Sequence, residues 1–255
     1  MDSAMEVFAV KTPLITESDD ASEIFLSSIG RMQLPLEDGD VIVVASKIVS
    51  VTEKRVRQVS DVVASRKAEE MGRKLALPSS LMQLILDESD SVLAGSPGYV
   101  LAVRRGFPCV NACIDVANSP GDSYILPPAD SDESAWSFKR RIEDKTGKRV
   151  AIIIADSGLL PGRRGTIGVA LGFAGLEPAR NYVGKKDLYG RTLRVTYQSV
   201  IDDISSAAKL LMGESNERIP FVIVRGAPIK LTDKRIGIDS TLLPPKICVF
   251  MSNVK

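Results

Sequence analysis

The sequence predicts a mixed α/β fold, and two patterns support this prediction. Short apolar runs rich in Val and Ile alternate along the chain with longer stretches of helical character. The length and β-branched content of these runs favour strands over buried helices. Several runs are apolar on both faces, which is typical of strands that are covered on both sides. The 255 residues, of which 44% are hydrophobic, suffice for one large core or two smaller lobes.

Seven apolar runs are predicted to form strands, and one of them alternates apolar and polar residues. That run, residues 193–202, is expected to lie in a half-exposed sheet because its alternation has a period of two. The seven predicted strands cover residues 5–10, 40–46, 98–104, 149–156, 193–202, 220–226 and 246–252.

Five stretches are predicted to be helices from their cap residues and composition. Pro78 is expected to end one helix and to open the next, and Gly147 follows a segment that begins acidic and ends basic. The predicted helices cover residues 18–32, 60–77, 78–89, 131–147 and 202–215.

Two long irregular stretches, residues 105–130 and 157–190, are rich in Gly, Pro, Asn and Asp. Loops of this length in a compact domain are usually functional or disordered, and their varied composition favours function. We expect one unit over residues 1–255, with lobes 1–130 and 131–255 divided by a weak boundary near 128–131.

Composition and charge exclude several classes of protein. The net charge of +1 and the aromatic content of 5% indicate neither a nucleic-acid nor a membrane partner. The apolar runs are too short to span a bilayer, and the acidic N-terminus carries no signal-peptide pattern, so we expect a cytoplasmic protein. Because histidine is absent, a catalytic triad, a Cys-His dyad and a His-ligated metal are excluded. A metal ion here would be an oxygen-binding one such as Mg²⁺ or Mn²⁺.

Two carboxylates follow predicted strands and are the first candidates for such a metal site. Asp156 and Ser157 end one apolar run, and Asp115 lies in a polar segment after another. If the two strands are neighbours, these oxygen donors converge where open α/β sheets bind ligands. The alternative is that each aspartate caps a helix or closes a turn.

Two further segments are candidates for phosphate binding. Glycines 162, 165 and 168 could let the backbone approach a ligand, and Arg163 could supply charge, although such loops are often plain turns. Lys47 follows a predicted strand and could reach a phosphate, or it could be a solvated surface lysine. The turn 185–191 could be a substrate clamp or an interface, and the sequence leaves both open.

Five segments together resemble those of the coenzyme F-420:L-glutamate ligases, also called gamma-glutamyl ligases, in the same order. The resemblance runs from about residue 6 to residue 228. It implies a two-lobed α/β fold with mixed sheets, an intertwined homodimer and a GTP-dependent ligase that uses two divalent cations, Mg²⁺ or Mn²⁺. The implied substrates are GTP, L-glutamate and the deazaflavin precursor, whose carboxylate is activated as an acyl phosphate. The segments are GDVIVVASKIVS, GFPCVNACIDVANS, IIIADSGLLPGRRGTIGVALGFAGL, KKDLYGRTLRVT and SSAAKLLMGES–IPFVIVRG.

The resemblance also implies a role for particular residues. Asp115 and Asp156 would hold the first metal ion, and Ser157 would reach the second. Asp115, Asp156 and Arg163 are the predicted catalytic residues. The predicted GTP contacts are Pro13, Leu14, Ile15, Ser46, Lys47 and Asn118.

Four positions depart from the pattern of the family: Val51, Arg105, Leu160 and Met212. Met212 stands where a glutamine ligand to the second metal ion is expected, and Glu214 is a possible substitute. Two alternatives therefore stay open. One is a related acid–amine ligase with a different acceptor or nucleotide, and the other is a family member without catalytic activity.

Overall fold

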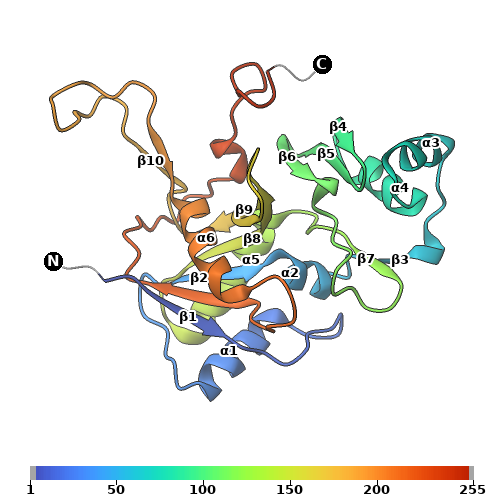
Figure 1. Ribbon diagram of the computed structural model, residues 1–255. Helices are drawn as coiled ribbons and strands as arrows, with labels where there is room; N and C mark the ends of the chain where they lie inside the picture. Colours follow the sequence, from blue (N-terminus) through green and yellow to red (C-terminus); the bar gives the residue numbers. More distant parts are fainter. Residues whose placement is uncertain (1–3, 253–255) are drawn as a thin grey trace.

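The computed structural model describes residues 4–252, and its centre is a five-stranded mixed sheet (Figure 1). The strand order is β1-β12-β2-β8-β9, and only β2 and β8 run parallel, with Ala45 level with Ala155. The strands are β1 (Glu6–Val10), β12 (Phe221–Arg225), β2 (Val41–Ala45), β8 (Ala151–Leu159) and β9 (Thr166–Ala174).

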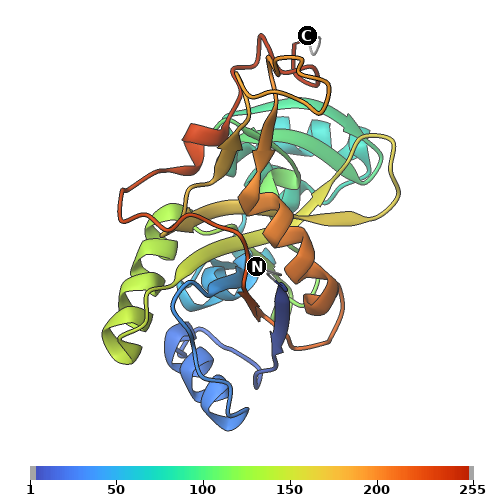
Figure 2. The same ribbon diagram turned by 90° about the vertical axis from the view of Figure 1, so that its left-hand side faces the viewer.

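Helices cover both faces of this sheet, and Figure 2 shows α5 and α6 on opposite sides of it. Along β2, Ile42 and Val44 enter the cluster under α1 (Ala21–Arg31) and α5 (Ser131–Thr146). Val41 and Val43 enter the cluster under α6 (Val200–Met212) on the other face. This alternation of fully buried residues confirms the prediction of strands that are covered on both sides.

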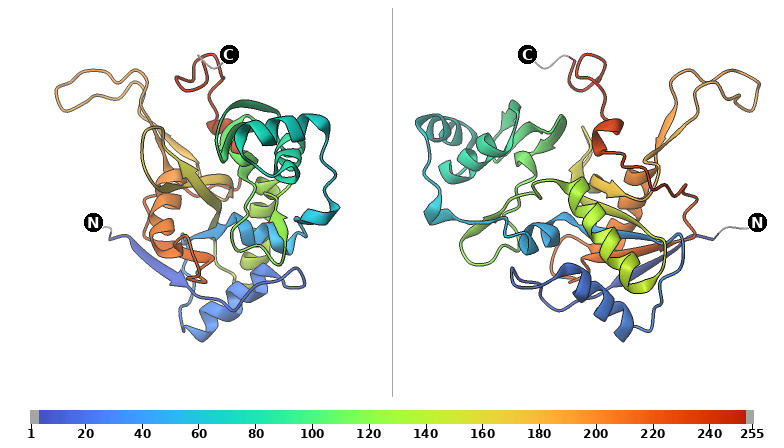
Figure 3. Two further views of the ribbon diagram at one scale, coloured as in Figure 1. Left: turned by 45° about the vertical axis from the view of Figure 1, so that its right-hand side comes forward. Right: turned by 180° about the vertical axis from the view of Figure 1, so that it is seen from behind.

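A smaller lobe with its own buried cluster stands beside the sheet (Figure 3). Helices α3 (Arg66–Leu75) and α4 (Ser79–Glu88) pack there with a three-stranded antiparallel sheet. The division into lobes 1–130 and 131–255 stays a prediction. The sheet of the small lobe consists of β4 (Ser91–Ser96), β5 (Tyr99–Arg104) and β6 (Phe107–Val110).

Short elements join these two parts and extend from them. Strands β3 (Val56–Gln58) and β7 (Ser123–Ile125) pair at the entry and exit of the small lobe. Strands β10 (Ala179–Asn181) and β11 (Tyr197–Ser199) form the base of a long arm that projects from the molecule in Figure 1. The remaining elements are α2 (Ser46–Thr52), η1 (Val59–Asp61), η2 (Asn111–Cys113) and η3 (Ile238–Thr241).

The mixed α/β prediction is confirmed, and three of its details are wrong. Residues 157–174, expected to be irregular, mostly continue β8 and return as β9 in a hairpin. Of the predicted strand 193–202, only Tyr197–Ser199 is a strand, and residues 200–202 open α6. Residues 246–252 form turns because no strand pairs with them within residues 4–252, and Ile247 and Val249 are exposed there.

No helix within the described part of the chain is long and apolar enough to cross a membrane.

Candidate active site

A cavity of about 860 Å³ lies where the main sheet meets the segment that returns from the small lobe. The ends of β2 and the outer part of β8 form its floor, and the loops that follow β1 and α6 form its rim. Nine of the ten predicted site residues line it, namely Pro13, Leu14, Ile15, Ser46, Lys47, Asp115, Asn118, Asp156 and Ser157.

The parallel pairing of β2 with β8 brings two of the predicted segments together. Ala45 and Ala155 are partners in the register, so the residues after each of them lie side by side. Helix α2 begins at Ser46, immediately after β2, whereas β8 continues through Asp156 to Leu159. Asp156 is therefore within a strand and does not follow the end of one.

Asp115 reaches the cavity by a different route from the one predicted. It follows the short turn η2 and pairs with Ile125, so it does not lie at the end of a strand adjacent to β8. Asn111, Ala112 and Cys113 in this turn have φ angles of 49°, 54° and 60°. Three successive non-glycine residues in the left-handed region cost about 1–2 kcal/mol each, and such strain gathers at functional sites.

Burial and hydrogen bonding hold this strained turn in place. Ala112 is fully buried in the cluster of the small lobe, and the side chain of Asn111 accepts a hydrogen bond of 2.9 Å from the backbone of Val100. The backbone groups of Asp115 and Ile125 exchange two hydrogen bonds of 2.9 Å. The fold thus sets the position of the Asp115 carboxylate through long-range contacts that no local motif reveals.

Lys47 lines the cavity and forms an ion pair with Asp115. Its Nζ lies 2.6 Å from Oδ2 of Asp115 and donates a hydrogen bond of 2.6 Å to the carbonyl of Ala117. Asn118 donates its side-chain amide to the carbonyl of Ser215 at 2.9 Å, which ties the 115–122 loop to the loop after α6. The predicted contacts of Lys47 and Asn118 with a nucleotide stay predictions.

Among the residues of this cavity, Asp156 has the carboxyl pKa that is shifted most from its usual value. Burial, together with the negative charge of Asp115, raises the pKa of its carboxyl from 3.8 to about 6. The backbone N–H of Ser157, which donates to Asp156 at 2.7 Å, and the charges of Lys209 and Lys47 act in the opposite direction. Two carboxylates that repel each other in a partly desolvated cavity favour the binding of a cation.

Glu214, and not Met212, provides an oxygen atom beside Ser157 that could bind a metal ion. The hydroxyl of Ser157 lies 3.2 Å from each carboxylate oxygen of Glu214, and the hydroxyl of Thr166 also donates to Glu214. Met212 packs into the buried cluster beneath α6. Although Met212 departs from the family pattern, the carboxylate of Glu214, two residues later, lies within reach of Ser157.

Arg163 and the glycines near it lie elsewhere. Arg163 is exposed in the turn between β8 and β9 and does not line the cavity, and its catalytic role stays a prediction. Glycines 162 and 165 adopt positive φ angles in the same turn. A Cβ at Gly168 would lie 2.3 Å from the backbone oxygen of Ser205, so this glycine lets α6 pack closely on β9.

Cys109 and Cys113 do not contribute a nucleophile. Their mutual hydrogen bond and burial raise the pKa of the Cys113 thiol well above its usual value. Because the thiolate is the reactive form, the raised pKa makes the Cys113 thiol a poor nucleophile.

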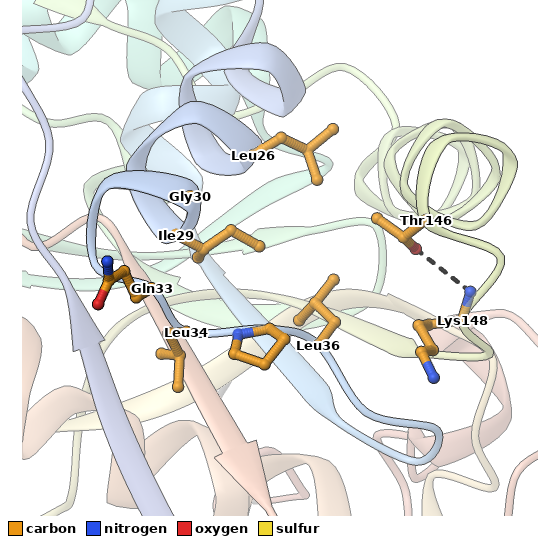
Figure 4. Close-up of a pocket in the computed structure, with 9 residues that line it drawn as sticks. Leu26, Ile29, Gly30, Gln33, Leu34, Leu36, Thr146 and Lys148 are labelled. Atoms are coloured by element: carbon orange, nitrogen blue, oxygen red, sulfur yellow. Dashed lines mark hydrogen bonds between the residues drawn. The ribbon is translucent and has the colours of Figure 1, made fainter.

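A second hollow, of about 470 Å³, has none of this chemistry. It lies between the end of α1 and the end of α5 and is lined mainly by apolar side chains such as Leu26, Ile29 and Leu36 (Figure 4). Lys148 is its one charged lining residue, and its backbone N–H donates to Thr146 at 3.3 Å. The cavity around Asp156 is therefore the candidate active site.

The donor set of this cavity fits a divalent cation that prefers oxygen. Asp115, Asp156 and Glu214 supply carboxylates, and Ser157 supplies a hydroxyl. Such ligands suit Mg²⁺ or Mn²⁺. Within residues 4–252, three or more acidic or cysteine side chains do not converge closely enough to form a ready-made metal site by themselves. Water or substrate oxygens would complete the coordination of a bound ion.

Comparison with known proteins shows the family to which the chain belongs. The sequence model of the family described as F420-0:Gamma-glutamyl ligase matches residues 9–226. The chain belongs to this family. The matched residues include most of the main sheet and the whole of the small lobe. The resemblance noted in the sequence is confirmed.

Three relatives illustrate how far the similarity to the ligase family extends, and each is named coenzyme F420:L-glutamate ligase. The protein of Archaeoglobus fulgidus is 42% identical over 87% of this chain and 88% of its own length. That of Methanothermobacter thermautotrophicus is 35% identical over 93% and 95%. That of Methanocaldococcus jannaschii is 35% identical over 95% and 94%.

Two polar residues were not among the predicted site residues: Lys209, which lines the cavity, and Thr166, which contacts the lining residue Glu214. Lys209 lies in the last turn of α6, and Thr166 opens β9. Thr166 reaches Glu214 only because β8 and β9 form a hairpin. The basic residue in the last turn of a helix was visible in the sequence, but it is typical of any helix end and points to no site.

Proposed function

We propose that this protein joins L-glutamate to the coenzyme F-420 precursor through an amide bond, with GTP as the energy source. The observation that carries the proposal is the cavity in which Asp115, Asp156, Ser157 and Glu214 gather, within a chain of the gamma-glutamyl ligase family. The relatives are named coenzyme F420:L-glutamate ligase and match nearly the whole chain.

The reaction takes place in two steps. A carboxylate oxygen of the precursor attacks the γ-phosphorus of GTP, and GDP leaves. The amine of L-glutamate then attacks the carbonyl carbon of the acyl phosphate, loses a proton and displaces inorganic phosphate. Both steps need charge neutralisation and the exclusion of water, since hydrolysis competes with the amine.

The residues of the cavity suit these needs. Asp115, Asp156, Ser157 and Glu214 would hold two divalent cations, which when bound neutralise the triphosphate charge. Lys47 adds positive charge beside Asp115, and Pro13 begins a rim segment against which a nucleotide base could pack.

The alternative of a family member without catalytic activity loses its main support. That alternative depends on Met212 in place of an oxygen ligand, and Glu214 contacts Ser157 instead. The alternative of a ligase with a different acceptor or nucleotide stays open, because Val51 lines the cavity, although Arg105, which pairs with Asp130 at 3.2 Å, and Leu160 do not.

The test is direct. Purified protein with precursor, GTP, Mn²⁺ and L-glutamate is expected to form a glutamylated product, detected by its mass, together with GDP and phosphate. Mixtures without GTP, or with ATP in its place, measure the nucleotide requirement, and other carboxylates measure the acceptor requirement. Absence of both product and GTP hydrolysis would contradict the proposal.

We also propose that the protein is a homodimer joined through the β10–β11 arm. Leu188 and Tyr189 at the arm tip are 99% and 86% exposed, and Val195 and Tyr197 are exposed along it. Contiguous exposed apolar side chains on a projecting segment are typical of association surfaces.

The double substitution Leu188→Glu and Tyr189→Glu is therefore expected to convert a dimer to a monomer, because it places charge in the apolar contact. Light scattering after size exclusion measures the mass. The control is Val63→Glu, at an exposed valine of the small lobe, which should leave the mass unchanged. A wild-type protein that is already monomeric would refute the dimer.

A further inference from the structure

Lys209 is a cation on the cavity wall for which the proposed function has no role. It lies in the last turn of α6, the helix that covers one face of the sheet (Figure 2). Its side chain is 21% exposed, and its Nζ lies 3.3 Å from Oε1 of Glu214. Its charge lowers the pKa of Glu214 and acts in the same direction on Asp156.

The pairing of Lys209 with Glu214 resembles that of Lys47 with Asp115 in the same cavity. Lys47 binds Asp115 at 2.6 Å, and Lys209 binds Glu214 at 3.3 Å. Each ammonium group thus neutralises one of the carboxylates that would hold a divalent cation. Because like charges repel strongly at such distances, a cation bound to Glu214 competes with the ammonium of Lys209.

A displaced ammonium group in this cavity needs another anionic partner. Lys209 is mostly buried, and an unpaired charge in a partly desolvated site is costly. In the proposed reaction, phosphate oxygens enter together with the cations. Lysine binds phosphate as a flexible point charge, and its four-carbon chain allows it to turn from one oxygen to another.

We propose that Lys209 is a nucleotide-binding residue that exchanges partners, an inference that rests on the proposed function. In the metal-free protein its ammonium group neutralises Glu214. When a divalent cation and the nucleotide bind, the ammonium group leaves Glu214 and binds a phosphate oxygen. Lys209 therefore opposes the binding of the cation alone and favours the binding of cation and nucleotide together.

The experiment measures Mn²⁺ binding by electron paramagnetic resonance, first without nucleotide and then with GDP, in the full-length protein. The variants are Lys209→Met and Lys209→Arg, with Lys209→Gln as a second neutral variant should the methionine variant fold poorly. The matched control is Lys230→Met, because Lys230 also pairs with a glutamate, Glu177 at 2.6 Å, but lies outside the cavity.

Lys209→Met is expected to bind Mn²⁺ alone about tenfold more tightly than wild type, because a competing charge is removed. It is expected to bind GDP in the presence of Mn²⁺ about tenfold more weakly, because a phosphate contact is lost. Lys209→Arg should restore most of the GDP affinity, and Lys230→Met should match wild type in both measurements.

Two results would overturn the inference alone while wild-type protein still binds Mn²⁺ and GDP. One is an unchanged or weaker Mn²⁺ affinity in Lys209→Met. The other is an unchanged GDP affinity with a raised KM for L-glutamate, which would place Lys209 at the amino-acid carboxylate. If wild-type protein binds no Mn²⁺ even with GDP, the proposed function itself fails and this inference fails with it.

Discussion

Replacing Asp156 by alanine is expected to lower metal-dependent GTP turnover by at least about a hundredfold, while the protein stays folded. Asp156 lines the cavity, where the charges of Asp115, Lys47 and Lys209 act on its carboxyl, and it is a proposed ligand of the first cation. Its removal takes a ligand from the cations that would neutralise the triphosphate charge. The rate of GDP formation with saturating GTP and Mn²⁺ measures the effect.

The control for this variant is Asp144→Ala. Asp144 is exposed on α5 and lies outside the cavity, so its replacement should leave turnover within about twofold of wild type, as expected for a neutral surface change. Far-UV circular dichroism checks that both variants are folded. Turnover near the wild-type rate in folded Asp156→Ala would remove Asp156 from the mechanism.

Replacing Asp156 by asparagine is expected to stabilise the metal-free protein at neutral pH by about 3 kcal/mol. The pKa of this carboxyl is about 6 in the folded chain against 3.8 in the unfolded one. The folded state therefore binds the proton more tightly, and ionisation of Asp156 removes stability as pH rises from about 4 to about 6. Asparagine keeps a side-chain acceptor for the N–H of Ser157 but carries no charge.

Urea unfolding in the presence of a chelator measures this difference. The gain should be near zero at pH 4 and reach its full size above pH 6. Added Mn²⁺ should stabilise wild type and leave Asp156→Asn nearly unchanged, because the variant has lost a ligand. A gain of equal size at pH 4 and pH 7 would show that the ionisation of Asp156 is not its cause.

Local sequence patterns predicted the strands that are buried on both faces and the helix whose ends carry clear signals. The runs in β2, β8 and β12 are apolar on both faces, and each is a central strand of the main sheet. Helix α5 begins and ends where its acidic start and Gly147 predicted. The run 246–252 has the same composition as a strand and forms turns, because a strand also needs a paired neighbour that its own sequence does not specify.

The site was predictable in its residues and less so in its geometry. Resemblance to the family pointed to Asp115, Asp156 and Ser157, and the fold brings them into one cavity. The route of Asp115 through a left-handed turn depends on the burial of Ala112 and on hydrogen bonds to Val100 and Ile125, which the local sequence does not specify. The role of Gly168 likewise depends on the approach of α6, which appears only when the helix packs on the hairpin.

The two central carboxylates belong to parts of the molecule that fold around different cores. Asp156 lies in β8 of the main sheet. Asp115 directly follows Ile114, which belongs to the hydrophobic cluster of the small lobe. An ion that both side chains bind would therefore be a non-covalent cross-link between these two cores. Local opening of the small lobe, followed by amide hydrogen exchange in α3 and α4, should slow as the concentration of free Mn²⁺ rises.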